Sequence, residues 1–197
     1  MNENELIKAC YHGDVNAMKT LYERNYSTML GICRRYSPRK VDAEDLLHDG
    51  FLKIFKDIGS YSYKGSFEGW MKRIMINTVL SHLRKAKREN TVEHNDYFVE
   101  EYHDDAENTE TQSELILNTE FSKEELIETI QTLPPGYQQV LNLYVIDGYQ
   151  HNEISEMLGI NVGTSKSQLN RARKLMKHKL FEMALERNKV LHENLDH

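Results

Sequence analysis

Apolar residues recur at helical spacing along most of the chain, and no segment shows the strict alternation that is typical of a strand. Residues 3–36 fit two helices separated by a turn at Gly13, and the second helix ends before Pro38. Asp42 is suited to cap a third helix, whose apolar face is formed by Leu46, Leu47, Phe51, Ile54 and Phe55. A long fourth helix is expected from about Ser66 to Arg88.

The last third of the chain is also predicted to be helical, with a helix beginning at Pro134 and Pro135. A short helix over His151–Leu158, a tight turn at Gly159 and a final helix from about Gly163 then form a helix-turn-helix pattern. Ser155 is small where the two helices would cross, and glycine tolerates the positive φ that the turn needs. The small core beneath is expected to contain Ile154, Leu158, Ile160 and Val162.

Charge divides the chain more clearly than the formal net value of −6 suggests. The segment 91–130 contains 13 acidic residues and one lysine, so it carries −12 and leaves +6 for the rest. Two blocks, 71–88 and 161–180, each contain six basic residues and no acid. We therefore expect a flexible acidic linker between two units that each carry a basic surface.

These patterns predict an all-α protein with two small helical domains, the C-terminal one a helix-turn-helix. The first domain is predicted over residues 1–90 and the acidic linker over 91–120. The second domain is predicted over 121–185 and is followed by a tail, 186–197. The tail is expected either to extend the last helix or to fray.

Both basic blocks have the chemistry of nucleic-acid binding. In the last helix a polar stripe suits a recognition helix, because such side chains reach base edges in the major groove while cations hold phosphates. This stripe contains Ser167, Asn170, Arg171 and Lys174, with Lys166 alongside. The fourth helix presents a second stripe, formed by Arg73, Asn77, Ser81, Arg84 and Arg88. Aromatic residues lie near it, and cations beside rings suit single-stranded or opening DNA. They are Tyr61, Tyr63, Phe67 and Trp70, and for Phe67 and Trp70 packing in the core is an equally good interpretation.

No catalytic motif is found. The carboxylates Asp42, Glu44, Asp45 and Asp49 are better explained by helix capping and surface charge than by a nuclease-like metal site, and we expect no enzyme, no cofactor and no metal. Cys10 and Cys33 lack metal-ligand spacing and are expected to be reduced thiols. No apolar run is long enough for membrane insertion and no signal-peptide pattern is seen, so we expect a cytoplasmic protein.

Three motifs, in order, resemble the sigma-70 family of bacterial RNA polymerase subunits. DAEDLLHDGFLKIF (42–55) resembles the polymerase-binding helix of that family. FEGWMKRIMIN (67–77) with LRK (83–85) resembles the segment that melts and reads the −10 element. LPPGYQQV (133–140) and GTSKSQLNRAR (163–173) resemble the domain that reads the −35 element. Two such domains without further regions are similar to the extracytoplasmic-function (ECF) subfamily.

The resemblance implies an alternative sigma factor that binds core RNA polymerase, reads both promoter elements and opens the DNA. The polymerase-binding residues would be Asp45, Asp49, Phe51, Leu52 and Phe55. The −10 element would be bound by Lys64, Ser66, Phe67, Trp70, Arg73, Asn77, Arg84 and Lys85. The −35 element would be bound by Thr164, Lys166, Ser167, Asn170, Arg171 and Lys174. Many relatives carry aspartate where this chain has Ser81, and often a bulkier residue in place of Asn170, so the promoter sequences stay open.

Core RNA polymerase and promoter DNA are thus the expected partners, and an anti-sigma factor or another recruiting partner is a family-level expectation. The free protein is expected to be a monomer. Two other classes stay open on the residues alone. A helix-turn-helix transcriptional regulator that is not a polymerase subunit would explain 130–180 but gives the basic helix 66–88 no role. A helical protein–protein adaptor would explain 42–55 but not two acid-free basic blocks.

Overall fold

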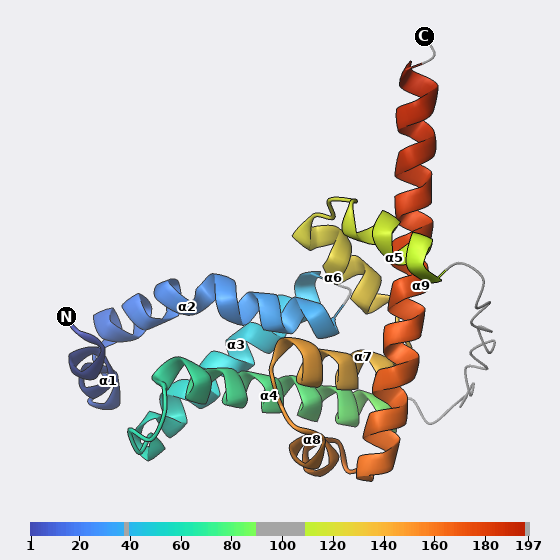
Figure 1. Cartoon of the computed structure of the whole chain (residues 1–197). Coiled ribbons are helices and arrows are strands. Elements are labelled where there is room, and N and C mark those ends of the chain that lie inside the picture. Colours follow the sequence, from blue (N-terminus) through green and yellow to red (C-terminus); the bar gives the residue numbers. More distant parts are fainter. Residues whose placement is uncertain (38–39, 90–108, 196–197) are drawn as a thin grey trace. The chain divides into compact units, whose positions relative to one another are not determined.

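The computed structural model describes residues 1–37, 40–89 and 109–195, which contain helices and no strand. The chain divides between residues 93 and 94 into two compact units. Each unit is a small group of helices with its own buried core (Figure 1). The prediction of an all-α chain with two helical domains is therefore confirmed.

The described part of the N-terminal unit contains α1 (Glu3–Tyr11), α2 (Val15–Tyr36), α3 (Lys40–Asp57), the 3-10 turn η1 (Ile58–Ser60) and α4 (Phe67–Glu89). Asp14 caps α2, because its Oδ1 accepts hydrogen bonds from the backbone N–H groups of Asn16 and Ala17 at 2.8 and 3.0 Å. Gly13 turns the chain before this cap with a φ of +81°. The two helices expected in residues 3–36 are confirmed.

The predicted cap of the third helix was wrong. Helix α3 begins at Lys40, so Asp42 lies inside its first turn instead of preceding it. A carboxylate in that turn still interacts favourably with the positive end of the helix dipole. The charge of Asp42 thus supports the start of α3 without capping it.

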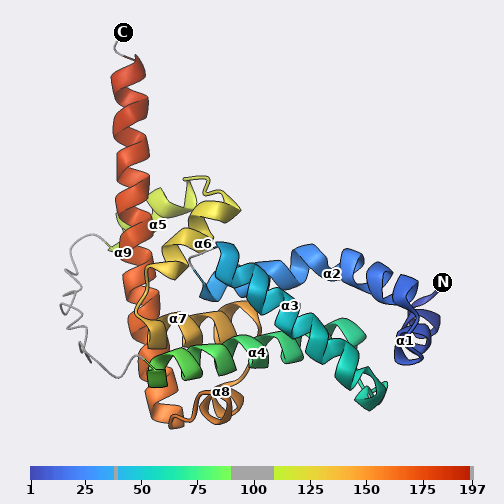
Figure 2. The ribbon, with the colours of Figure 1, turned by 180° about the vertical axis from the view of Figure 1, so that it is seen from behind.

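Helix α3 packs against both α2 and α4 (Figure 2). The contact is close because Gly50 of α3 faces Met75 of α4, where an added Cβ would lie 2.3 Å from the methionine sulfur. Cys33 Sγ of α2 lies 3.5 Å from the same sulfur, so three helices meet at Met75.

Both cysteines lie in the core. Burial raises the pKa of the Cys33 thiol to about 12. The second cysteine, Cys10, is also buried and free.

The C-terminal unit contains α5 (Thr109–Leu117), α6 (Lys123–Gln131), α7 (Pro135–Leu141), the π-helical turn η3 (Asn142–Ile146), α8 (His151–Leu158) and α9 (Val162–Leu195). The predicted helix-turn-helix is confirmed, since α8 has the expected limits and Gly159 turns the chain with a φ of +67°. Ile154 is fully buried in its core, whereas Ile160 and Val162 are only half-buried.

The acidic segment was predicted to be a linker as far as residue 120, and this is wrong for residues 109–117. They form α5, which packs on α9. Leu115 and Ile116 are half-buried in this helix and supply its apolar side. Linker residues 91–108 lie outside the described part of the chain. The tail, expected either to fray or to extend the last helix, is helical as far as Leu195.

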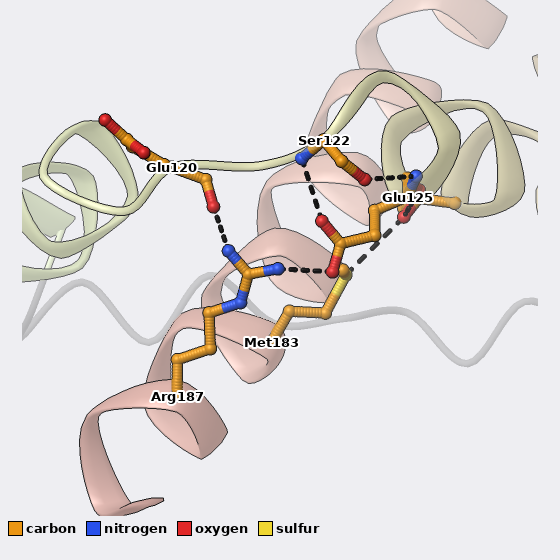
Figure 3. A network of polar contacts seen from close by, with 6 residues as sticks. Glu120, Ser122, Glu125, Met183 and Arg187 are labelled. Carbon is orange, nitrogen blue, oxygen red and sulfur yellow. Dashed lines mark hydrogen bonds and ion pairs between the residues drawn. The ribbon is translucent and has the colours of Figure 1, made fainter. Parts of the chain in front are cut away.

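Arg187 holds the far part of α9 to the connection between α5 and α6 (Figure 3). Its guanidinium donates hydrogen bonds to the Glu120 carbonyl oxygen and to a Glu125 carboxylate oxygen. It also lies 5.3 Å from the centre of the Phe121 ring. Glu125 at the same time caps α6 through the backbone N–H of Ser122 at 2.8 Å. Arg187 and these capping bonds lower the pKa of Glu125 from 4.5 to about 2. Residues beyond 185 thus belong to the second unit.

Candidate functional site

Helix α4 has a buried apolar side and an exposed polar edge. Met71, Met75 and Val79 are buried on one side. The residues predicted to form the polar stripe are all exposed, namely Arg73, Asn77, Ser81, Arg84 and Arg88. Lys85 is exposed as well. Arg84 is partly oriented by its own helix, because it donates to Ser81 Oγ at 3.3 Å. This edge offers cations and one amide at regular helical spacing.

An aromatic cluster precedes and begins α4. The Phe67 and Trp70 rings stack with centres 5.5 Å apart, and the centre of the Tyr61 ring lies 5.0 Å from that of Phe67. The Tyr61 hydroxyl donates to the Gly65 carbonyl at 2.8 Å and so ties the loop together. Tyr63 is 54% exposed and has a φ of +58°. The cluster therefore gives the loop a fixed shape beside the polar edge.

The predicted −10 residues of this region do not all reach the surface. Lys64 and Ser66 are exposed and Trp70 is half-buried. Ser66 also caps the start of α4, since its Oγ accepts a hydrogen bond from the Gly69 N–H at 3.1 Å. Phe67 is only 1% exposed, so its side chain lies in the core. The expectation that Phe67 binds DNA directly is corrected, and its burial indicates that it supports the loop.

Helix α3 presents an apolar side chain among carboxylates. Leu52 is 68% exposed, Asp45 is exposed, and Asp49 and Phe55 are half-buried. Phe51 is 2% exposed and packs on the Tyr22 ring at 4.6 Å. The expectation of a direct partner contact by Phe51 is therefore corrected. Leu52, Asp45 and the exposed parts of Asp49 and Phe55 are therefore accessible to a partner protein.

One contact on this surface was not predicted. His82 Nε2 of α4 lies 2.8 Å from a carboxylate oxygen of Asp49 on α3. The two residues are 33 positions apart in the chain, so no helical spacing links them. The pair joins the helix with the exposed leucine to the helix with the polar edge.

The recognition-helix residues lie at the start of α9. Lys166, Ser167, Asn170, Arg171 and Lys174 are exposed, and Thr164 is half-buried. Asn161 caps the helix, because its Oδ1 accepts a hydrogen bond from the Thr164 N–H at 2.7 Å. Leu169 and Ala172 are buried on the opposite side. The polar stripe that the sequence predicted thus faces solvent.

Polar residues beneath this stripe escaped the sequence analysis. His151 Nδ1 lies 2.8 Å from Oγ of Ser165, which is fully buried. The His151 ring stacks on Tyr144 at 4.6 Å, and the Arg173 guanidinium lies 5.6 Å from the Tyr144 ring centre. Burial, and then the charges of Lys166 and Arg173, lower the pKa of His151. These residues come from three elements, and only the tertiary fold brings them together.

Two negative findings apply to the described residues alone. Within residues 1–37, 40–89 and 109–195, no three histidine, cysteine or acidic side chains are grouped so that they could hold a metal ion. None of the helices in this part of the chain is long and apolar enough to cross a membrane.

Comparison with known proteins places these surfaces in a family. Residues 21–89 match Sigma-70 region 2, and residues 123–176 match Sigma-70, region 4. The chain therefore belongs to the sigma-70 family. Within that family it falls in the ECF subfamily and is an alternative RNA polymerase sigma factor.

Individual relatives agree along nearly the whole chain. The ECF RNA polymerase sigma-E factor of Haemophilus influenzae is 26% identical over 189 residues, which cover 91% of this chain and 96% of the relative. SigW of Bacillus subtilis, an ECF RNA polymerase sigma factor, is 26% identical over 186 residues, with 90% and 96% covered. The solved structure of the sigma factor RpoE of Bartonella quintana, in complex with the anti-sigma factor NepR, has the same fold. Its TM-score is 0.53 at 18% identity, covering 85% of this chain and 98% of that one.

Proposed function

We propose that this sigma factor binds core RNA polymerase through α3, opens the −10 element along α4 and reads the −35 element with α9. One observation carries the proposal: the two acid-free basic blocks, 71–88 in α4 and 161–180 around the first turns of α9, turn their polar stripes to solvent while the apolar sides of these helices are buried. Any amphipathic helix turns its polar side to solvent, so what favours DNA is the chemistry of these exposed sides, which carry cations and amides suited to phosphates and base edges.

The start of α9 fits the major groove of duplex DNA. Side chains near the N-terminus of a recognition helix contact base edges, and cations further along contact phosphates. Lys166, Ser167 and Asn170 would be the reading residues, and Arg171 and Lys174, which are also exposed, would follow them along the groove. Thr164, half-buried beside the cap of the helix, lies closest to the turn.

The edge of α4 fits DNA that is losing its base pairing. Asn77 has both a donor and an acceptor with which to hold a base edge, and Arg73, Arg84 and Lys85 supply charge for the adjacent backbone. Trp70 offers part of a ring to an unstacked base, and Lys64 and Ser66 extend this surface into the loop. Capture of unpaired bases on this edge would favour the open state of the promoter.

The surface of α3 suits a protein partner. Leu52 would enter an apolar pocket of the polymerase, with Asp45 and Asp49 at its margin and Phe55 beside it. The protein would act without catalysing a reaction itself, in the cytoplasm, and as a monomer when free. An anti-sigma protein is a further partner that we propose, because the Bartonella quintana sigma factor is bound by one.

Run-off transcription tests this function. Purified bacterial core polymerase is incubated with genomic fragments from the host of this protein, with and without the protein. New discrete start sites that need the protein would support the proposal, and their upstream sequences would define the promoter. If no new start appears and the protein does not co-migrate with core, the roles proposed for α3, α4 and α9 fail.

Replacement of Asn77 by alanine should reduce promoter opening about tenfold to a hundredfold, because a base-specific amide contact contributes about 1–3 kcal/mol. The measurement is permanganate reactivity of unpaired thymines in the −10 region with saturating holoenzyme. Asn16→Ala is the matched control, since Asn16 is an exposed asparagine of the same unit far from the α4 edge in sequence. Core binding should not change in either variant. Unchanged opening in Asn77→Ala would contradict the −10 assignment.

A further inference from the structure

We propose that His151 is a positioning residue, which sets the orientation of the first turns of the recognition helix through its contact with the buried Ser165. This inference rests on the proposed reading of duplex DNA by α9 and adds residues that touch no base. It concerns the specificity of the helix-turn-helix, that is, its affinity for its own DNA site relative to other sequences.

Three elements meet at the His151 ring. The residue begins α8, and its ring stacks on Tyr144 of η3 with ring centres 4.6 Å apart. Its Nδ1 lies 2.8 Å from Ser165 Oγ of α9. The ring orientation is thus fixed by a stacking contact, and its nitrogen is directed at one hydroxyl. Stacking holds the ring while the hydrogen bond specifies the position of the helix that follows.

Ser165 lies directly before the residues that face solvent. It is the fourth residue of α9 and is 0% exposed, whereas Lys166 and Ser167 next to it are exposed. A rotation of this turn about the helix axis would move all three side chains together. A contact on the buried serine therefore controls where the two exposed side chains point.

The surroundings keep the ring suited to this contact. Burial, together with the positive charges of Lys166 and Arg173, lowers the pKa of His151, so the neutral ring predominates near neutral pH. A neutral imidazole has one donor and one acceptor, and it can bond the serine hydroxyl in either direction. Without a polar partner at position 151, the buried hydroxyl would be unsatisfied, which favours a shift of the turn.

Positioning predicts a loss of discrimination. Non-specific affinity comes from cations and phosphates and tolerates a small shift of the helix, whereas base reading does not. The quantity to measure is the specificity ratio, defined as affinity for the selected −35 duplex divided by affinity for a scrambled duplex of equal length. A residue that only stabilises the fold would change the folded fraction and would lower both affinities alike.

The test uses the full-length chain and a −35 duplex that it selects from random double-stranded DNA, well below the melting temperature of each variant. His151→Phe, which keeps a ring but has no polar atom, and Ser165→Ala should each lower the specificity ratio about tenfold. The double variant should lose no more than either single variant, because both remove the same contact. His151→Asn, whose amide can replace Nδ1, should stay within about threefold of the wild type. His178→Phe in the later part of α9 is the matched control and should leave the ratio unchanged.

The outcomes separate this inference from the function on which it rests. Arg171→Ala is the reference for base and phosphate contact and should weaken binding to the selected duplex. If Arg171→Ala has no effect, α9 does not read DNA, and the proposed function and this inference both fail. If Arg171→Ala weakens binding while His151→Phe leaves the specificity ratio unchanged, the positioning role alone is overturned. Additive losses in the double variant would also overturn it.

Discussion

Replacement of Phe67 by alanine should lower the free energy of unfolding of the N-terminal unit by about 3–5 kcal/mol, the usual cost of removing a buried aromatic ring. Phe67 is 1% exposed and contacts both Tyr61 and Trp70, so the surrounding rings could not close the cavity without moving the loop. Domains commonly have only about 5–15 kcal/mol of stability in total. The variant should therefore be close to unfolding at physiological temperature.

Trp70 makes this measurement specific to one unit. It is the single tryptophan of the chain and stacks on Phe67 with ring centres 5.5 Å apart. Its fluorescence during denaturation therefore reports on the N-terminal unit alone. Tyr26→Ala is the control, because Tyr26 is an exposed aromatic residue of the same unit and its loss should cost less than about 1 kcal/mol. If Phe67→Ala were as stable as the wild type but defective in promoter opening, a direct DNA contact by Phe67 would be the better explanation.

Replacement of Leu52 by aspartate should weaken binding to core RNA polymerase by at least about thirtyfold while the protein stays folded. An interface anchor contributes about 2 kcal/mol or more, and a buried unpaired carboxylate adds a further penalty. The fold should tolerate the change because Leu52 is 68% exposed. The measurement is a competition titration against labelled wild-type protein for a limiting amount of core enzyme.

Val15→Asp is the matched control for this experiment. Val15 is 75% exposed at the start of α2, so the control introduces the same charge at another exposed apolar residue of the same unit. It should bind core like the wild type. Equal weakening in both variants would indicate a general effect of charge, and wild-type binding by Leu52→Asp would remove α3 from the polymerase interface.

The helix-turn-helix could be predicted from the sequence because its signals are local. A glycine that turns the chain, a small serine at the crossing and a stripe of polar residues lie within one short segment. The structure has α8 at its predicted limits, Gly159 in the left-handed region and an exposed stripe on α9. The exposed edge of α4 follows in the same way from helical periodicity.

Burial by distant neighbours could not be predicted in the same way. Phe51 and Leu52 are adjacent and both apolar, yet one is 2% and the other 68% exposed, because α2 covers only one side of α3. Helix α5 was missed for a related reason. The acidic composition of its segment concealed the half-buried Leu115 and Ile116, and the helix on which α5 packs, α9, lies far away in the sequence.

The environment of the two cysteines has a practical consequence for solution studies. Thiolates, and not thiols, are alkylated and oxidised, and the buried Cys33 has its pKa raised to about 12. The pKa of Cys10 is raised as well by its burial. The folded protein should therefore resist maleimide dyes and mild peroxide without any mutation of its own cysteines. A cysteine introduced at an exposed position of each unit could then carry a fluorophore pair against a silent background, so that the distance between the units could be followed as the protein joins polymerase.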